Sequence, residues 1–164
     1  ATEYLDSHAD NLPLIEAYVL LVVHAYNGDL HFLSSPVART LERALQFCDQ
    51  SEVIRKWITT LLQAYYEELS PDAMLYSIRQ SHMIFITLQD NPNDVVRVNR
   101  CIQILSIYCR NTQLRDAIIT IDSMFILLST LRKNAGTESD TFLHITKLLY
   151  SIVKDSKSGF VDKL

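Results

Sequence analysis

The sequence predicts an all-α fold of about eight helices, and an internal repeat together with the composition supports this prediction. Residues 83–91 align with residues 126–134 at an offset of 43. The two segments share three residues: Thr87 with Thr130, Leu88 with Leu131, and Asn91 with Asn134. At an offset of 44, three more pairs correspond: Ile104-Leu105 with Leu148-Leu149, Tyr108-Cys109 with Ile152-Val153, and Arg110-Asn111 with Lys154-Asp155. Repeats of roughly 40 to 47 residues are typical of armadillo and HEAT arrays, so we expect a right-handed α-solenoid.

The composition agrees with a helical domain. Hydrophobic residues make up 48% of the 164 residues and charged residues 21%, while only 3 Gly and 4 Pro interrupt the chain. Long helices joined by short links are the simplest arrangement for such a chain. The three cysteines, Cys48, Cys101 and Cys109, have neither disulfide nor zinc spacing, which indicates a reducing compartment.

Capping signals and apolar periodicity place the helices in order. Three Ser/Asn-Pro pairs, at Ser35, Ser70 and Asn91, are predicted to begin helices because proline is favoured at the first helical position. Ser51 and Thr137 are predicted as further starts. The Asn27-Gly28-Asp29 and Asn134-Ala135-Gly136 turns supply left-handed residues for helix ends. The predicted helices span residues 12–26, 36–48, 52–68, 72–89, 93–109, 112–118, 122–133 and 138–154.

One domain is expected over residues 1–164. Residues 83–155 would form two regular repeats, and residues 12–68 a divergent N-terminal helical cap. The most apolar stretch, residues 12–25, contains Pro13, Glu16 and His24 and is too short to span a bilayer, so no membrane segment is expected. The acidic start lacks an apolar core and does not resemble a signal peptide, and the missing initiator Met suggests a piece of a longer protein.

The predicted helix 93–109 carries the candidate binding site. Its apolar stripe contains Val98, Cys101, Ile102, Leu105, Tyr108 and Cys109. A polar row contains Asn99, Gln103, Ser106 and Arg110 with Arg100 beside it, and Lys147 and Lys154 are its counterparts in the next repeat. The last helix of each armadillo unit lines the concave surface, so this row is a candidate for contact with a partner peptide or helix. A merely solvated helix face would give the same pattern.

Charge is uneven along the chain. Residues 1–91 hold 5 Lys/Arg against 12 Asp/Glu, a net charge of −7, and residues 92–164 hold 10 against 7, a net charge of +3. The C-terminal half could face an acidic partner, although scattered charges on solvated helices would look the same. Nucleic acid is not expected as a partner, because the basic residues are not clustered and the overall charge is −4.

The sequence does not favour an enzyme, a cofactor or a metal site. It contains no nucleophile elbow, no H-E-x-x-H and no glycine-rich phosphate loop. The histidines His24, His82 and His144 lie in apolar helical stretches and are expected at core or boundary positions. Cys101 and Cys109 share a helix face and are expected in the core. Trp57 is also expected to pack in the core, and one of the adjacent Tyr65 and Tyr66 should reach the surface.

Residues 84–105, 122–133 and 142–150 resemble the C-terminal armadillo-like region of the abnormal-spindle (ASPM) family. Val96-Arg97, residues 101–105 and residues 122–132 carry most of this resemblance. It implies a spindle-pole protein that gathers microtubule minus ends, located in the cytoplasm on the cytoskeleton and centrosome, and in the nucleus during interphase. The calponin-homology domains and calmodulin-binding motifs of the family lie upstream of this region, so no calmodulin binding is expected here. Ile102-Gln103 lacks the arginines of such a motif, with Ile107 and Thr112 in their places.

The expected function is therefore a non-catalytic protein-interaction module of a spindle-pole microtubule-organising protein. A cytosolic adaptor or scaffold unrelated to the spindle is the alternative. An all-α enzyme would require a deep polar pocket where histidines and carboxylates converge. A purely structural role, with the domain ending a longer array or associating with itself, would leave the oligomeric state to be measured.

Overall fold

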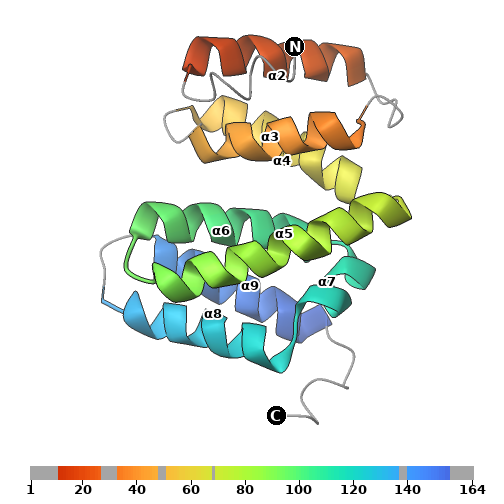
Figure 1. Cartoon of the computed structure of the whole chain (residues 1–164). Helices are drawn as coiled ribbons and strands as arrows, with labels where there is room; N and C mark the ends of the chain where they lie inside the picture. Colours follow the sequence, from red (N-terminus) through yellow and green to blue (C-terminus); the bar gives the residue numbers. More distant parts are fainter. Residues whose placement is uncertain (1–10, 27–32, 48–50, 68, 137–139, 156–164) are drawn as a thin grey trace. The chain divides into compact units, whose positions relative to one another are not determined.

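The described part of the chain is entirely helical. The computed structural model describes residues 11–26, 33–47, 51–67, 69–136 and 140–155, and it places eight helices and no strand there (Figure 1). These are α2 (Leu12–Tyr26), α3 (Ser35–Phe47), α4 (Glu52–Glu67), α5 (Pro71–Asp90), α6 (Val95–Tyr108), α7 (Thr112–Ile118), α8 (Ile121–Lys133) and α9 (Thr141–Asp155). The predicted all-α class is confirmed, and each predicted helix has a counterpart.

The chain divides into two compact units, residues 1–69 and residues 70–164. The first unit contains α2, α3 and α4, and the second contains α5 to α9. All of the sequence that carries the offset-43 and offset-44 repeat lies in the second unit.

In the first unit, α4 packs against both α2 and α3. Its buried stripe is Ile54, Ile58, Leu61, Leu62 and Tyr66. The Tyr66 hydroxyl donates a hydrogen bond to the Glu42 carboxylate of α3, and both side chains are buried. Trp57 is exposed, so its predicted core position is wrong, because it lies at the edge of that stripe and not at its centre. Tyr65 is half-buried, and its hydroxyl lies 3.0 Å from the Ser35 hydroxyl.

Among the described helices of the second unit, α6 buries the most residues. It packs against α5 and α9, and every residue of its predicted apolar stripe is buried. Ile104 and Ile107, outside that stripe, are buried as well. α6 is therefore covered around most of its circumference, and its exposed residues, Val96 and Arg97, lie in its first turn.

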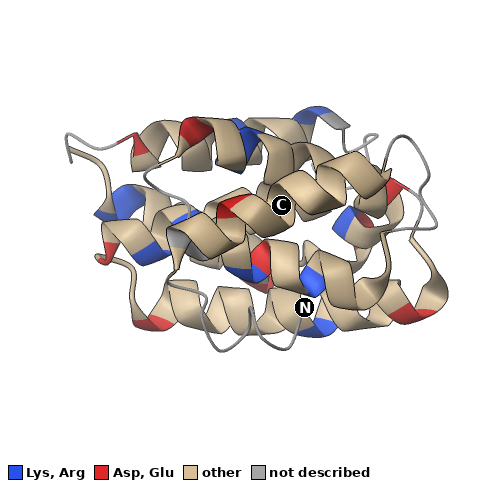
Figure 2. Ribbon diagram, turned by 90° about the horizontal axis from the view of Figure 1, so that it is seen from above, with Lys and Arg blue, Asp and Glu red and all other residues tan. Residues whose placement is uncertain are grey.

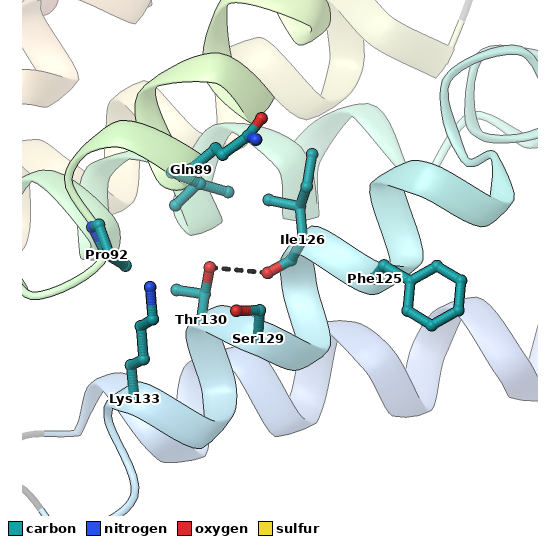
Figure 3. A pocket seen from close by; sticks show the side chains of 8 residues that line it. Gln89, Pro92, Phe125, Ile126, Ser129, Thr130 and Lys133 are labelled. Carbon is teal, nitrogen blue, oxygen red and sulfur yellow. Dashed lines mark hydrogen bonds between the residues drawn. The ribbon is translucent and has the colours of Figure 1, made fainter.

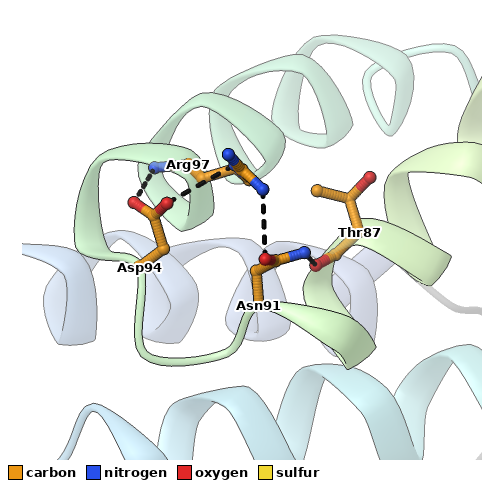
Figure 4. A network of polar contacts seen from close by, with 4 residues as sticks. All are labelled: Thr87, Asn91, Asp94 and Arg97. Atoms are coloured by element: carbon orange, nitrogen blue, oxygen red, sulfur yellow. Dashed lines mark hydrogen bonds and ion pairs between the residues drawn. The ribbon is translucent and has the colours of Figure 1, made fainter.

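The structure confirms one of the predicted Pro starts and contradicts another. Ser70 caps α5, with its hydroxyl accepting from the Ala73 amide and Pro71 in the first turn. Asn91 instead ends α5, because its amide N–H donates to the Thr87 carbonyl. The cap of α6 is Asp94, whose carboxylate accepts from the Arg97 amide at 3.0 Å (Figure 4).

The other predicted helix starts and ends have mixed outcomes. Ser35 is the first residue of α3 and not its cap, whereas Ser51 accepts from the Ile54 amide at the start of α4 as predicted. Gly136 has φ of 92°, as expected for a left-handed position after a helix. Thr137 and the Asn27-Gly28-Asp29 turn lie outside the described residues.

The offset-43 repeat corresponds to a repeated helix end. In α5 and α8, Thr87 and Thr130 donate to the carbonyl four residues earlier, each at 2.8 Å. Asn91 and Asn134 then donate through Nδ2 to the Thr87 and Thr130 carbonyls. The sequence match therefore marks the same local hydrogen-bond pattern at the C-terminal ends of two helices in one unit.

Candidate functional site

The predicted polar row of α6 is only partly open to solvent. Asn99, Arg100 and Gln103 are half-buried, and Gln103 Oε1 is buried without a hydrogen-bond donor among the described residues. Arg110, which follows the C-cap Cys109, is exposed. The row is thus a boundary between the packed core and the surface, because α6 has neighbours on most sides.

The predicted counterparts on α9 lie in solvent. Lys147 and Lys154 are exposed, and α9 buries the opposite stripe of Thr141, Ile145, Leu148 and Ile152. Leu143, one turn before Lys147, and Tyr150, between the two lysines, lie on the same side of α9 and are also exposed. The ammonium nitrogen of Lys154 is 5.9 Å from the centroid of the Tyr150 ring, within reach of a cation–π interaction.

One contact joins these two sets of residues. His144 Nδ1 of α9 lies 3.4 Å from Asn99 Oδ1 of α6, and the two helices pack side by side. The contact connects the boundary row of α6 to the solvent side of α9. We call the resulting surface the α6–α9 ridge, and it consists of Asn99, Gln103, Arg110, His144, Lys147 and Lys154.

The two lysines that α9 contributes to the ridge have no acidic residue one helical turn away. No Asp or Glu lies three or four residues from Lys147 or Lys154 in the sequence. Figure 2 shows Lys and Arg on several described helices with Asp and Glu among them. Positive charge is therefore spread over the molecule and is not confined to the ridge. Amide, imidazole and ammonium groups of this kind can bind carboxylates and backbone carbonyls.

A groove between α5 and α8 is a feature that the sequence did not predict. It has a volume of about 330 Å³ and lies in the second unit (Figure 3). Its lining residues are Leu88, Gln89, Pro92, Phe125, Ile126, Ser129, Thr130 and Lys133. The groove depends on the turn after α5, which is held by a hydrogen bond from Asn134 Nδ2 to the Pro92 carbonyl at 2.9 Å. Asn134 and Pro92 are 42 residues apart in the sequence, so no local sequence pattern predicts their contact.

The two cysteines of α6 and its C-cap are buried, and the histidines differ in exposure. Cys101 and Cys109 are buried as predicted, and burial raises the thiol pKa to about 11 for Cys101 and about 12 for Cys109. Both are therefore neutral thiols near pH 7 and poor nucleophiles. His144 is half-buried, but His24 and His82 are exposed, contrary to the core or boundary position predicted for them.

Two further properties concern metals and membranes. Among the residues that the structure describes, no three His, Cys, Asp or Glu side chains come together in a way that could hold a metal ion. None of the helices in that part of the chain is both long enough and apolar enough to cross a bilayer.

Because comparisons with known proteins suggest no function, the ridge and the groove are the features from which a function can be inferred. No protein-family model, curated protein or solved structure matches this chain.

Proposed function

We propose that this chain is a non-catalytic protein-interaction module, whose second unit is an armadillo-like pair of repeats that holds an acidic peptide or helix on the α6–α9 ridge. The observation that carries the proposal is the Asn99–His144 contact, which joins equivalent helices of consecutive repeats into one polar surface. Helical-repeat proteins use extended surfaces of this kind to bind partners.

The chemistry of the ridge supports an acidic partner. Arg110, Lys147 and Lys154 are exposed cations, and no carboxylate of the same helix face neutralises the two lysines. Such a surface raises the association rate of a negatively charged segment and fixes its register. Leu143 and Tyr150, exposed beside the lysines on the same side of α9, add apolar area that would be buried under the partner.

The sequence resemblance suggests the setting. Residues 84–105, 122–133 and 142–150 resemble the abnormal-spindle family, so we propose the spindle pole as the place of action and a microtubule-organising protein as the parent molecule. A cytosolic adaptor that uses the same ridge away from the spindle is the second candidate. It rests on the ridge alone and needs no family relationship.

A double charge reversal tests the binding site. Lys147→Glu with Lys154→Glu changes two exposed residues of α9, so helix content measured by circular dichroism should not change. Partners recovered from mitotic and interphase cells by affinity capture should fall about tenfold, as expected when favourable charge pairs become repulsive. Arg100 is unsuitable for this test because it is half-buried on α6.

A matched variant controls for net charge. Lys56→Glu with Arg79→Glu makes the same change at exposed positions of α4 and α5, and capture should persist. Equal capture by wild type and by the ridge variant would contradict the proposed site. A fluorescent fusion separates the two settings, since accumulation at spindle poles supports the first and a diffuse signal in mitosis supports the adaptor.

A further inference from the structure

In the second unit, α8 and α9 expose several apolar residues, whereas the residues at the equivalent positions of α5 and α6 are buried. Residues at equivalent repeat positions differ sharply in exposure. At an offset of 43, Phe85 of α5 is 7% exposed whereas Leu128 of α8 is 46% exposed. At an offset of 44, Val98 of α6 is 1% exposed and Phe142 of α9 is 43% exposed. Cys109 and Val153 show the same contrast, at 3% and 49%.

The cause of the contrast is the stacking of one helix pair on the other. α8 packs on α5, and α9 packs on α6, so the side chains of the first pair that face the second are buried. Within the described part of residues 70–164, no further helix pair covers α8 and α9 in the same way. Repeat units of this type shelter their apolar faces only through a neighbour.

The uncovered residues form one continuous helical stripe on α8. Ile121, Phe125 and Leu128 are exposed and lie at i, i+4 and i+7, which places them on one side of the helix. Phe125 also lines the groove between α5 and α8, and its ring points away from Thr130 and Lys133 in Figure 3, so the stripe adjoins one end of the groove. We call Ile121, Phe125 and Leu128 of α8, with Phe142 and Val153 of α9, the open face.

The open face is also distinct from the α6–α9 ridge. At about 100° per residue, Phe142 and Val153 are turned by roughly 100° to 140° around α9 from Lys147 and Lys154. Both surfaces can therefore be occupied at the same time, and this inference does not rest on the proposed function.

We propose that the open face binds the open face of a second copy of this chain, with the two α8 helices antiparallel about a twofold axis. Charge complementarity selects this occupant and this direction. Asp122 is exposed in the first turn of α8, and Arg132 and Lys133 are exposed in its last turn. When two such helices cross between Phe125 and Leu128 in opposite directions, position 122 of one lies opposite positions 131 and 132 of the other.

The geometry is self-complementary in both its apolar and its charged parts. Phe125 of one α8 helix packs near Leu128 of the other. Asp122 of each copy lies near Arg132 of the other copy, so two symmetric charge pairs form, as an isologous interface requires. A parallel arrangement would place Asp122 beside Asp122 and Arg132 beside Arg132, which is unfavourable.

Sedimentation equilibrium on the full 164-residue chain tests the proposal. The wild type should show a concentration-dependent monomer–dimer equilibrium, and Phe125→Glu with Leu128→Glu should raise the dimer dissociation constant at least a hundredfold. Leu75→Glu with Met83→Glu places the same charges at exposed apolar positions of α5 and should leave the equilibrium unchanged. A wild type that stays monomeric at millimolar concentration, or a dimer that the α8 variant does not weaken, would overturn the proposal.

A charge swap tests the antiparallel direction. Asp122→Arg alone and Arg132→Asp alone should each raise the dissociation constant about tenfold, because each creates two like-charge pairs across the axis. The variant carrying both changes restores opposite charges and should return to within about threefold of wild type. Failure of the double variant to recover, with circular dichroism unchanged, would refute the antiparallel pairing of α8.

Discussion

At the scale of single residues, the two buried thiols of α6 and its C-cap link burial to pH dependence. Burial is the largest cause that raises the pKa of Cys101 to about 11 and of Cys109 to about 12, from an ordinary value of 9.0, and the nearby Arg97 and Arg115 oppose it only in part. A thiol that stays protonated in the folded state but ionises in the unfolded state favours unfolding at high pH.

We therefore expect the free energy of unfolding to be unaffected by these thiols below pH 9 and to fall between about pH 9 and pH 12. The loss between pH 8 and pH 10.5 should be about 2 to 4 kcal/mol, from 1.36 kcal/mol per pKa unit for each thiol. Denaturant unfolding at several pH values measures it. The contribution of the thiols is read as the difference from Cys101→Ala with Cys109→Ala, because this variant lacks both thiols and keeps all other side chains.

Residue types alone did not determine which side chains are exposed. His24, His82 and Trp57 lie in apolar sequence but are exposed, because each helix buries only one side and the phase of that side depends on neighbouring helices. Cys101 and Cys109 were placed correctly because their spacing of eight keeps them on the apolar side of α6.

At the scale of helices, the sequence predicted the existence and order of α2 to α9, with ends within a few residues. This success rests on local signals, since caps and apolar periodicity act over one or two turns. The error at Asn91-Pro92 has the same origin. Asn is suited to both helix starts and helix ends, and only the later Asp94, whose carboxylate accepts from the Arg97 amide, shows where α6 begins.

The candidate site was less predictable than the helices. The half-buried state of Asn99 and Gln103 depends on the packing of α6 within the unit, and Asn99 contacts a residue 45 positions later in the chain. The groove beside α8 likewise depends on the distant pair Asn134 and Pro92. The sequence indicated which residues share a helix side, but not what lies against that side.

Asn134 joins two elements, and its repeat counterpart Asn91 provides a matched control. Asn134 is fully buried and donates to the Pro92 carbonyl at 2.9 Å and to the Thr130 carbonyl at 2.8 Å. Asn134→Ala removes this buried donor from the half-buried Pro92 carbonyl and should lower the free energy of unfolding by about 1 to 3 kcal/mol. Denaturant unfolding at pH 7 measures the change.

Asn91→Ala should cost less, below about 1 kcal/mol, because water can replace the contacts of a half-buried side chain. Asn91 donates to the Thr87 carbonyl at 3.3 Å and accepts from Arg97 at 3.0 Å, both on the more exposed side (Figure 4). Equal losses for the two variants would show that the link from α8 to the Pro92 turn does not stabilise the unit.

At the scale of the whole molecule, the division at residues 69 and 70 separates a unit whose described helices are α2, α3 and α4 from one that contains the repeated helix ends. The second unit has a core of its own, with Leu88, Leu105, Leu127 and Ile145 fully buried on four different helices. Its buried stripes come from α5, α6, α8 and α9, which contact one another within the unit. Local contacts of this kind suit independent folding.

We expect residues 70–164 to fold without residues 1–69. The fragment should keep a helical circular dichroism spectrum and unfold in a single cooperative step, because the apolar contacts named above lie within it. Leu105→Ala, which opens a cavity at a fully buried position, should lower its stability by about 2 to 5 kcal/mol. Leu75→Ala, at an exposed position of α5, should change it by less than about 0.5 kcal/mol. A fragment that is unfolded, or that responds equally to both substitutions, would mean that the repeat pair needs residues 1–69 to form its core.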